Sequence, residues 1–442
     1  MAACLGAQTI SGDLIGTVLD ESGGAVANAS VTAANTATGV KSSTTTNPSG
    51  AYRLSNLPAG TYDVTASAPR FAPSTLKNVA IQLNQVATAN LTLSLATVST
   101  TVDVSEAPAV IDTTTAQVEN SFSEKQSEDL PTASSGFGVL NLSMLDAGVA
   151  SAGGVGVGIG TGPSVGGQRP RSNNFMVEGI DNNEKSTTGP EVFIPNDSVA
   201  EFSMLQNQFT AEYGHSAGGQ FNTVVKSGTN TLHGMLYEYM QNRNLNAVDQ
   251  HLALQGILSN PRYDQNRLGA NIGGAIIKNK WFYFGDFEYN PVGQAATAAG
   301  VVLTPTAQGY SVLSGIPGVS KTNLGVFQQY VPPAPSATST ISVGGTTVPV
   351  GGLPIAAPNY QNSYNAVAST DYNISDRDQI RGRFIYNNVS FIDTTATLPV
   401  FYTTVPQKAY LATFTEYHTF SSTLVNEFRL GYNRMFQDYP AG

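Results

Sequence analysis

The stretch from Gly166 to Gly234 is the feature of this 442-residue chain that most constrains its fold. Short apolar runs at 175–177 and 221–225 have the composition of β-strands. Clusters of Gly and Asn beside each run supply turns with positive φ. Charged residues are spread through the stretch, among them Arg169, Arg171, Glu178, Asp181, Asp197, Glu201 and Glu212. This pattern predicts a compact polar β unit. Such a unit suits a water-lined lumen better than a β unit with an apolar core would.

Three motifs follow one another in this stretch. GQRPRSNNFMVEGID begins at Gly167, AEYG begins at Ala211, and KSGTNTLHG ends at Gly234. In this order they resemble the plug domain of TonB-dependent outer-membrane receptors, in particular the Oar-like group. The resemblance implies a plug domain over residues 126–230, followed by a transmembrane β-barrel.

The composition is that of a turn-rich, secreted β protein. Charged residues make up 12% of the chain, against about 25% in average soluble proteins, and there are 44 Gly and 23 Pro. A net charge of −10 argues against nucleic-acid partners, which require a basic surface. The single cysteine, Cys4, excludes an internal disulfide and a cysteine-based zinc site. No cofactor is expected.

Residues 1–9 resemble the end of a signal peptide that lacks its basic region and most of its apolar region. The Ala-Ala-Cys sequence that ends at Cys4 also resembles a lipoprotein cleavage site, and the sequence leaves both interpretations open. No run of about 18 apolar residues occurs, so no transmembrane helix is predicted.

Residues 10–96 are predicted to form a β-sandwich, because short strand-like runs alternate with turns every 8–12 residues or so. Leu91, Leu93 and Leu95 alternate with polar residues, which gives one buried face. The pattern, including LPAGTYDV from Leu57, resembles the carboxypeptidase regulatory-like domain, a prealbumin-like sandwich. Some relatives of this sandwich bind carbohydrate, and the resemblance does not imply peptidase activity. We expect Tyr52 and Tyr62 to be core or corner residues.

Residues 97–125 are predicted to link the sandwich to the plug. In TonB-dependent receptors a segment at this place, the TonB box, pairs with the edge of a sheet in TonB, which is β-augmentation. The alternative is an ordinary linker strand or the last strand of the sandwich. The segment assigned to the TonB box comprises Thr101, Val102, Asp103, Val104 and Ser105.

Arg169 and Arg171 flank Pro170 in the predicted plug. The resemblance implies that plug arginines pair with carboxylates on the barrel wall and latch the plug. Arginine forms bidentate pairs with carboxylates, so the role is chemically sound. Solvation of both side chains by water in the lumen is the alternative.

From residue 231 to residue 442 the sequence predicts part of an antiparallel transmembrane β-barrel. Apolar and polar residues alternate, as expected for strands with one face in lipid and the other in the lumen. In one strand Ile380, Phe384 and Tyr386 oppose Arg381, Arg383 and Asn387; in another Phe428, Leu430 and Tyr432 oppose Glu427, Arg429 and Asn433. The predicted strands are 235–239, 266–277, 281–289, 364–373, 379–387, 410–420 and 424–436.

A Pro-, Gly-, Ala- and Thr-rich segment runs from Pro291 to Pro358. We expect it to be a long extracellular loop, which is unusual in compact soluble domains and common in outer-membrane barrels. Plugged barrels of this class have about 22 strands, and the strands predicted here are too few to close around a plug. The sequence is therefore expected to be the N-terminal part of a larger protein.

No enzyme or metal site is predicted. His215, His233, His251 and His418 are far apart and form no metal-binding motif. A G-x-S-x-G match at 162–166 lacks the strand before it and the helix after it that a nucleophile elbow requires.

The predicted fold is mainly β: a prealbumin-like sandwich, a small mixed plug and the first part of a barrel. The resemblance implies a transporter that takes up an unidentified extracellular ligand, energised by TonB and its inner-membrane complex. The barrel would contact outer-membrane lipid, and the N-terminal domain would lie in the periplasm. The alternative function is a surface-exposed adhesion or carbohydrate-binding outer-membrane protein on the same scaffold.

Overall fold

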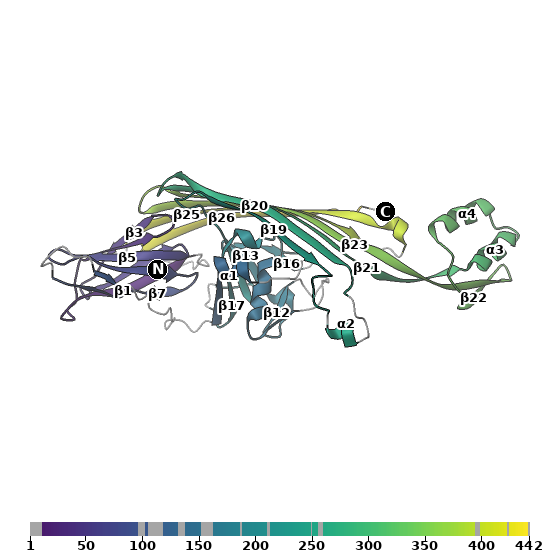
Figure 1. Ribbon diagram of the computed structural model, residues 1–442, viewed down its shortest axis with the longest axis horizontal. Helices are drawn as coiled ribbons and strands as arrows, with labels where there is room; N and C mark the ends of the chain where they lie inside the picture. Colours follow the sequence, from purple (N-terminus) through teal and green to yellow (C-terminus); the bar gives the residue numbers. More distant parts are fainter. Residues whose placement is uncertain are drawn as a thin grey trace, which may run out of the picture.

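The computed structural model describes three structural units, an N-terminal sandwich, a plug and a large curved sheet (Figure 1). The signal-peptide remnant with Cys4, the TonB-box residues Thr101 and Ser105, and most of the Gly-rich run before the plug motif lie outside the described residues. The described residues are 11–95, 102–104, 118–130, 138–151, 162–185, 188–209, 213–248, 250–254, 260–393, 398–421 and 424–440.

Two sheets form the sandwich, as predicted. The first contains β1 (Gly12–Asp20), β4 (Ala51–Leu57), β7 (Val86–Thr88) and β8 (Leu91–Leu93). The second has the order β3 (Lys41–Thr45), β2 (Ser30–Asn35), β5 (Gly60–Ser67), β6 (Ser74–Ile81), β9 (Val102–Val104). Alternate residues of β1, β2, β4, β5, β6, β7 and β8 fill one apolar core.

The prediction that Tyr52 and Tyr62 are core or corner residues is confirmed. Both side chains are buried. The Tyr52 hydroxyl donates to the Ala89 carbonyl at 2.6 Å, and the Tyr62 hydroxyl donates to the Pro58 carbonyl at 2.9 Å. Each buried hydroxyl therefore has the hydrogen-bond acceptor that it needs inside a core.

A five-stranded sheet organises the plug, with the order β10 (Val118–Ser123), β17 (Val199–Asn207), β18 (Gln220–Val225), β13 (Asn174–Val177), β14 (Ile180–Asp181). The two strands predicted at 175–177 and 221–225 are β13 and β18, which pair in parallel. Ser123 caps α1 (Glu124–Asp129) with a capping box. The remaining plug elements are η1 (Gly138–Leu145), β11 (Val149–Ser151), β12 (Pro163–Val165), η2 (Pro170–Ser172), β15 (Asn183–Glu184), β16 (Gly189–Pro190) and η3 (Asn196–Ser198).

The expectation of a plug without an apolar core was wrong. Phe175, Phe202 and Phe221 are buried at the centre of the plug. The ring centroids of Phe175 and Phe221 are 5.2 Å apart, and those of Phe202 and Phe221 are 6.2 Å apart. The charged residues lie around this core, because each apolar strand is flanked by polar turns.

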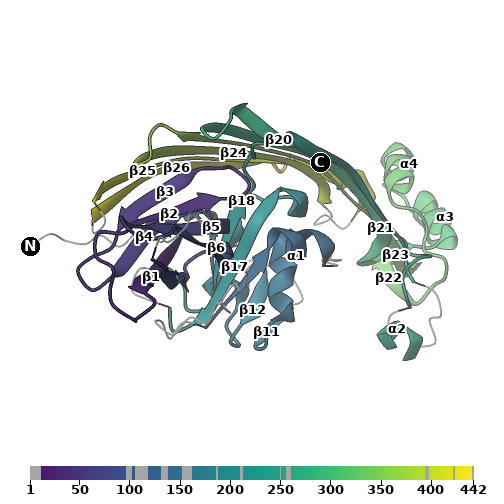
Figure 2. The same cartoon turned by 60° about the vertical axis from the view of Figure 1, so that its left-hand side comes forward.

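The curved sheet arches over both the sandwich and the plug (Figure 2). Its strands follow one another in sequence, which is typical of antiparallel barrels. The strands in spatial order are β19 (His233–Asn242), β20 (Tyr263–Ile277), β21 (Trp281–Pro305), β23 (Thr346–Asn373), β24 (Asp378–Asp393), β25 (Thr403–Ser421) and β26 (Leu424–Gln437).

The predicted alternation along the strands of the curved sheet is confirmed. Arg381, Arg383 and Asn387 of β24 are buried on the concave side. Phe384 of the same strand and Phe428 of β26 are 46% and 54% exposed on the convex side. A period of two residues therefore separates a polar inner face from an apolar outer face.

The segment predicted as a long loop connects β21 and β23 but consists mostly of strands and helices, so it is not an irregular loop. Its extracellular location stays a prediction. The strands β21 and β23 continue past the plug as a hairpin, with Thr297 opposite Ala357 and Pro305 opposite Val350. Ile316, Val348 and Val350 form a small core under the lobe at its tip. The lobe contains α3 (Ala307–Gly315), α4 (Lys321–Tyr330) and β22 (Ser339–Val343).

Two local signals explain the order of this segment. Val and Thr residues favour the strands, and Thr306 and Ser320 cap α3 and α4 through their side chains. The described residues include two further short helices, α2 (Gln250–Leu254) and η4 (Pro399–Phe401). None of the helices in the described ranges has the length and apolar character needed to cross a membrane.

Candidate functional site at the plug–barrel interface

The plug lies under the concave face of the curved sheet (Figure 2). Because side chains alternate along each strand, the inward residues of β20, β21, β23, β24 and β26 face the plug. Many of these residues are polar and buried. Buried polar groups require partners, and the plug loops provide them.

Arg383 of β24 is the centre of one buried charge cluster. Its Nε atom lies 3.1 Å from Oε1 of Glu178 in the plug, and its Nη1 atom lies 2.5 Å from Oδ1 of Asp371 in β23. The side chains of Arg383 and Glu178 are 3% and 2% exposed. The Val225 amide also donates to Glu178 Oε1 at 2.9 Å. One arginine therefore joins plug and sheet where water has little access.

The backbone of Glu178 has an unusual conformation. Its φ is 51°, in the left-handed region that residues other than Gly seldom adopt. Such conformations cost of order 1–3 kcal/mol and persist where surrounding contacts hold them. The ion pair with Arg383 and the amide of Val225 are contacts of this kind.

Arg267 of β20 is the centre of a second cluster. Its Nη2 atom lies 3.1 Å from Oδ2 of Asp197 in the plug, and its Nε atom lies 3.3 Å from Oε2 of Glu288 in β21. The guanidinium stacks 4.2 Å above the ring of Tyr239, whose hydroxyl donates to Asp197 Oδ1 at 2.9 Å. Asp197 is fully buried, so its charge depends on these partners.

Neutral hydrogen bonds add to the two clusters. The Phe193 amide of the plug donates to Asn387 Oδ1 at 2.7 Å, and Asn387 Nδ2 donates back to the Phe193 carbonyl at 2.9 Å. Three further bonds join plug and sheet: Ser198 Oγ to Asp286 Oδ2 at 2.9 Å, Ser369 Oγ to the Lys226 carbonyl at 2.6 Å, and Asn433 Nδ2 to the Asp181 carbonyl at 2.8 Å.

Apolar contact contributes to the interface as well. Four inward residues of the sheet belong to the same buried cluster as the plug phenylalanines: Val367, Ile385, Ala409 and Leu411. The plug is therefore held by both apolar packing and polar bonds.

Gly228 explains part of the KSGTN motif at the junction. A Cβ atom at this position would lie 2.2 Å from the carbonyl oxygens of both Gly274 and Tyr283. These are backbone atoms of β20 and β21 and cannot move away as a flexible side chain could. Only Gly allows the chain to leave the plug at this point.

The sandwich contacts both the plug and the sheet. The Leu83 amide donates to Glu201 Oε1 of the plug at 3.1 Å. Asn230, which precedes β19, links the sandwich to the sheet: its amide donates to the Ala37 carbonyl at 3.2 Å, and the Asn279 amide between β20 and β21 donates to its Oδ1 at 2.8 Å. Burial raises the pKa of Glu201 to about 7, and the Leu83 amide opposes this shift.

The structure places the two predicted latch arginines away from the charge clusters. Arg169 and Arg171 are exposed beside and within η2, and the ion pairs described above use Arg267 and Arg383 of the sheet instead. The assignment of Arg169 and Arg171 as a latch stays a prediction. The sequence analysis placed Arg383 on the polar face but could not identify its partner, because Glu178 is 205 residues away.

Val102–Val104 of the predicted TonB box form β9, the edge strand of the second sandwich sheet. The strand pairs in parallel with β6, with Ser74 opposite Val102. This placement agrees with the alternative that the segment is the last strand of the sandwich. The TonB-box assignment also stays a prediction, since an edge strand is compatible with both roles.

Two regions of this chain are similar to known protein families. Residues 13–94 match the family described as "Carboxypeptidase regulatory-like domain", and residues 224–442 match the family described as "Outer membrane beta barrel domain". The chain thus contains a region similar to outer-membrane β-barrel domains, preceded by a region similar to carboxypeptidase regulatory-like domains.

Among curated proteins, the chain is a homologue of the TonB-dependent transporter Oar of Myxococcus xanthus. The two are 25% identical over 287 residues, which cover 63% of this chain and 26% of Oar. The chain therefore spans about a quarter of the length of this relative. The predicted resemblance is confirmed, and a relative that is a transporter agrees with the expectation of a non-enzymatic protein.

Solved structures with a similar chain path include one outer membrane transporter and two receptors. The outer membrane transporter YddB from Escherichia coli has 12% identity and a TM-score of 0.46, over 71% of this chain and 38% of that chain. The ferric enterobactin receptor PfeA from Pseudomonas aeruginosa has 12% identity and a TM-score of 0.46, over 73% of this chain and 41% of that chain. The siderophore receptor PiuA from Acinetobacter baumannii has 12% identity and a TM-score of 0.38, over 73% of this chain and 45% of that chain.

Proposed function

We propose that the protein is a TonB-dependent outer-membrane transporter that takes up an extracellular ligand when the plug moves. The observation that carries this proposal is the polar seat of the plug, in which Arg383 and Arg267 of the sheet hold Glu178 and Asp197. When the plug moves, water can solvate the separated charges, whereas a seat made only of apolar contacts would offer no such compensation. The plug is thus held firmly and can still be released.

The proposed coupling element is β9 with its flanking residues. In the described residues β9 pairs on one side only, with β6, and ends the strand order of its sheet. An edge of this kind can accept a strand from a partner through main-chain hydrogen bonds. We place this edge and the sandwich in the periplasm, where TonB would pull on the segment that leads directly into the plug.

A single backbone donor tests the coupling. Val104→Pro removes an amide donor from the proposed strand, while Val104→Ile keeps both the donor and the strand propensity. We expect the proline variant to lose binding of the purified periplasmic domain of TonB, and the isoleucine variant to keep it. Deletion of residues 101–105 should likewise abolish energised uptake while ligand remains bound at the cell surface. Equal TonB binding by all variants would contradict the proposed role of this segment.

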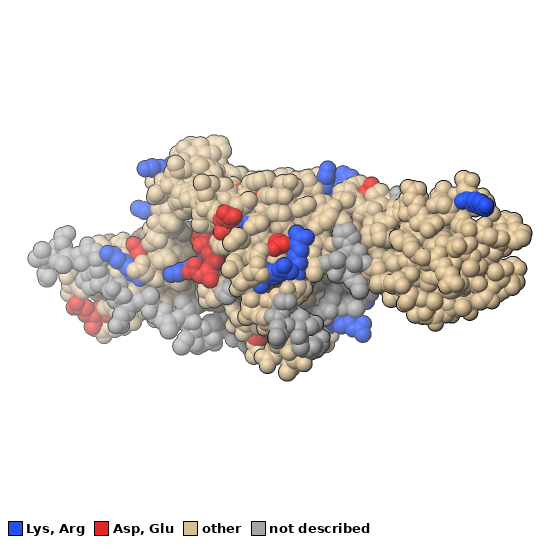
Figure 3. Space-filling model, turned by 45° about the vertical axis from the view of Figure 1, so that its right-hand side comes forward, with Lys and Arg blue, Asp and Glu red and all other residues tan. Residues whose placement is uncertain are grey.

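Adhesion on the same scaffold is the second candidate, and the lobe beyond the sheet favours it. Residues 291–358 contain one charged residue, Lys321, and Figure 3 shows this lobe as an almost uncharged projection. Val326, Phe327 and Tyr330 of α4 are about half exposed. Glycan-array binding by the protein, together with the absence of energised uptake, would support adhesion over transport.

A further inference from the structure

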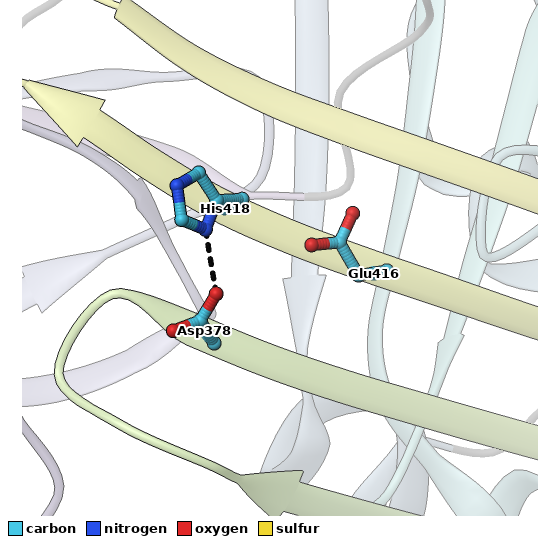
Figure 4. Close-up of side chains that lie close together, drawn as sticks. All are labelled: Asp378, Glu416 and His418. Atoms are coloured by element: carbon cyan, nitrogen blue, oxygen red, sulfur yellow. Dashed lines mark hydrogen bonds and ion pairs between the residues drawn. The ribbon is translucent and has the colours of Figure 1, made fainter.

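Three potential metal ligands meet on the convex face of the curved sheet (Figure 4). Asp378 begins β24, and Glu416 and His418 lie two residues apart near the end of β25. Asp378 is directly opposite His418 in the strand register, and Ile380 is opposite Glu416. One ligand atom from each of the three side chains lies within 4.8 Å of the others.

The alternation of the strands fixes the side of the sheet on which this group lies. Asp378 is an even number of residues from exposed Phe384 on β24, so the two share a face. Glu416 and His418 are likewise an even number of residues from exposed Phe414 on β25. All three ligands therefore point away from the plug. The group is separate from the plug–barrel interface and from its charge clusters.

We propose that Asp378, Glu416 and His418 bind a divalent transition-metal ion, with Zn²⁺ as the best match. One imidazole nitrogen and two carboxylate oxygens are ligands that Zn²⁺ accepts. Three protein ligands leave a fourth position open for water or for an oxygen of a lipid headgroup. The ion would also neutralise two neighbouring carboxylates whose charges repel each other.

The hydrogen bonds of the group suit this role. His418 Nδ1 and Asp378 Oδ1 lie 2.5 Å apart in a hydrogen bond, and a metal ion bound to both atoms would replace the proton between them. Ser375 donates to Asp378 Oδ2 at 2.5 Å, and Asn426 donates to Glu416 Oε2 at 3.2 Å. Each carboxylate is thus oriented from outside the group and has its other oxygen left for the ion.

An aromatic neighbour restricts the imidazole as well. The ring of Phe420 contacts that of His418 edge-on, with centroids 4.2 Å apart and an interplanar angle of 69°. Ligand rings held by their surroundings lose less freedom when a metal binds. Contacts with residues outside the group therefore restrict the side chains of all three ligands.

The location gives the site a structural role. Glu416 lies in the same cross-strand row as Trp281 and Tyr372, whose rings are 5.6 Å apart. Trp and Tyr residues concentrate where a membrane meets water, so the ligands lie at the membrane interface. An unpaired carboxylate on the lipid-facing surface has a small cost near the interface. A bound cation would remove this cost and tie the ends of β24 and β25 together.

Metal titration of the whole protein tests the site. Protein purified from outer membranes in detergent and freed of metal with a chelator is titrated with Co²⁺, and visible absorption reports its coordination. We expect one equivalent to bind and Zn²⁺ to displace it. His418→Gln and Glu416→Gln should each weaken binding at least about tenfold, because changes outside the ligand shell already cost about 10- to 100-fold.

His233→Gln is the matched control, since His233 also lies on a strand of the sheet and is exposed but belongs to no such group among the described residues. This variant should bind Co²⁺ as the unmodified protein does. Far-UV circular dichroism checks that each variant keeps its strands. The proposal is overturned if the unmodified protein shows no saturable binding, or if folded His418→Gln and Glu416→Gln proteins bind as tightly as the control.

Discussion

Replacement of Arg383 by Met should loosen the plug far more than any exposed substitution. Methionine keeps most of the length of the side chain but removes its charge, so Glu178 and Asp371 lose the cation that lies 3.1 and 2.5 Å from them. Breaking a buried ion pair by removing one partner costs about 3–5 kcal/mol. The side chains of Arg383 and Glu178 are almost fully buried, so solvent screening does not reduce this cost appreciably.

The cost should appear in the equilibrium between the seated plug and the unseated plug. A factor of ten in population corresponds to about 1.4 kcal/mol, so a cost of about 3–5 kcal/mol raises the unseated fraction by roughly 100- to 4,000-fold. When opening and closing are fast relative to cleavage, the rate of proteolysis follows this fraction. The initial rate of cleavage within residues 118–230, measured in detergent at low protease concentration, is therefore the assay.

Arg262→Met is the matched control for this experiment. Arg262 also pairs with an aspartate, Asp264, at 2.7 Å, but its side chain is 63% exposed, and exposed pairs contribute about 0–1 kcal/mol. The double variant Glu178→Gln with Arg383→Met should be less destabilised than the sum of the single variants, because the two groups interact directly. Cleavage of Arg383→Met at the rate of Arg262→Met, or strict additivity in the double variant, would refute the proposed role of the ion pair.

Three further predictions concern other contacts of the plug. Gly228→Ala should cost about 1–3 kcal/mol by overpacking against two carbonyl oxygens, whereas Gly325→Ala in α4, with open space around it, should leave the urea midpoint unchanged or slightly higher. Asn387→Ala should cost about 1–3 kcal/mol in the same measurement, because it leaves buried main-chain groups of the plug unpaired. The folded pKa of Glu201, about 7, lies above its ordinary value of 4.5, so its contribution to stability is present below pH 4.5 and is lost as the pH rises through 7. The loss should be on the order of 3 kcal/mol and should lower the urea midpoint of the unmodified protein over this pH range. An equally steep fall in Glu201→Gln would show that another group is responsible.

Local rules explain what could be predicted from the sequence. The period of two in β24 and β26 identified the outward residues Phe384 and Phe428 and the inward residue Arg383 before any contact was known. Turn residues and alternating apolar residues were sufficient to predict the sandwich, and Tyr52 and Tyr62 lie in its core as expected. Each of these features depends on residues close together in the chain.

The errors came from misjudged packing. The charged residues of the plug motif suggested a polar interior, but the plug folds around Phe175, Phe202 and Phe221. Its residues Glu178 and Asp197 pair with arginines of the sheet. The Pro- and Gly-rich segment suggested a loop, but its two halves pair across the hairpin with Thr297 opposite Ala357. In both cases the decisive partner lies elsewhere in the chain.

The sequence by itself therefore determined which residues form strands, which face of each strand is polar, and that the chain has the parts of a plugged barrel. Only the tertiary structure decided that Arg383 pairs with Glu178 across 205 residues and that His418 meets Asp378 across 40. The physical reason is that strand alternation follows from local geometry. Contacts between side chains on different strands depend instead on register and on how the plug is seated under the sheet, and the whole chain sets both.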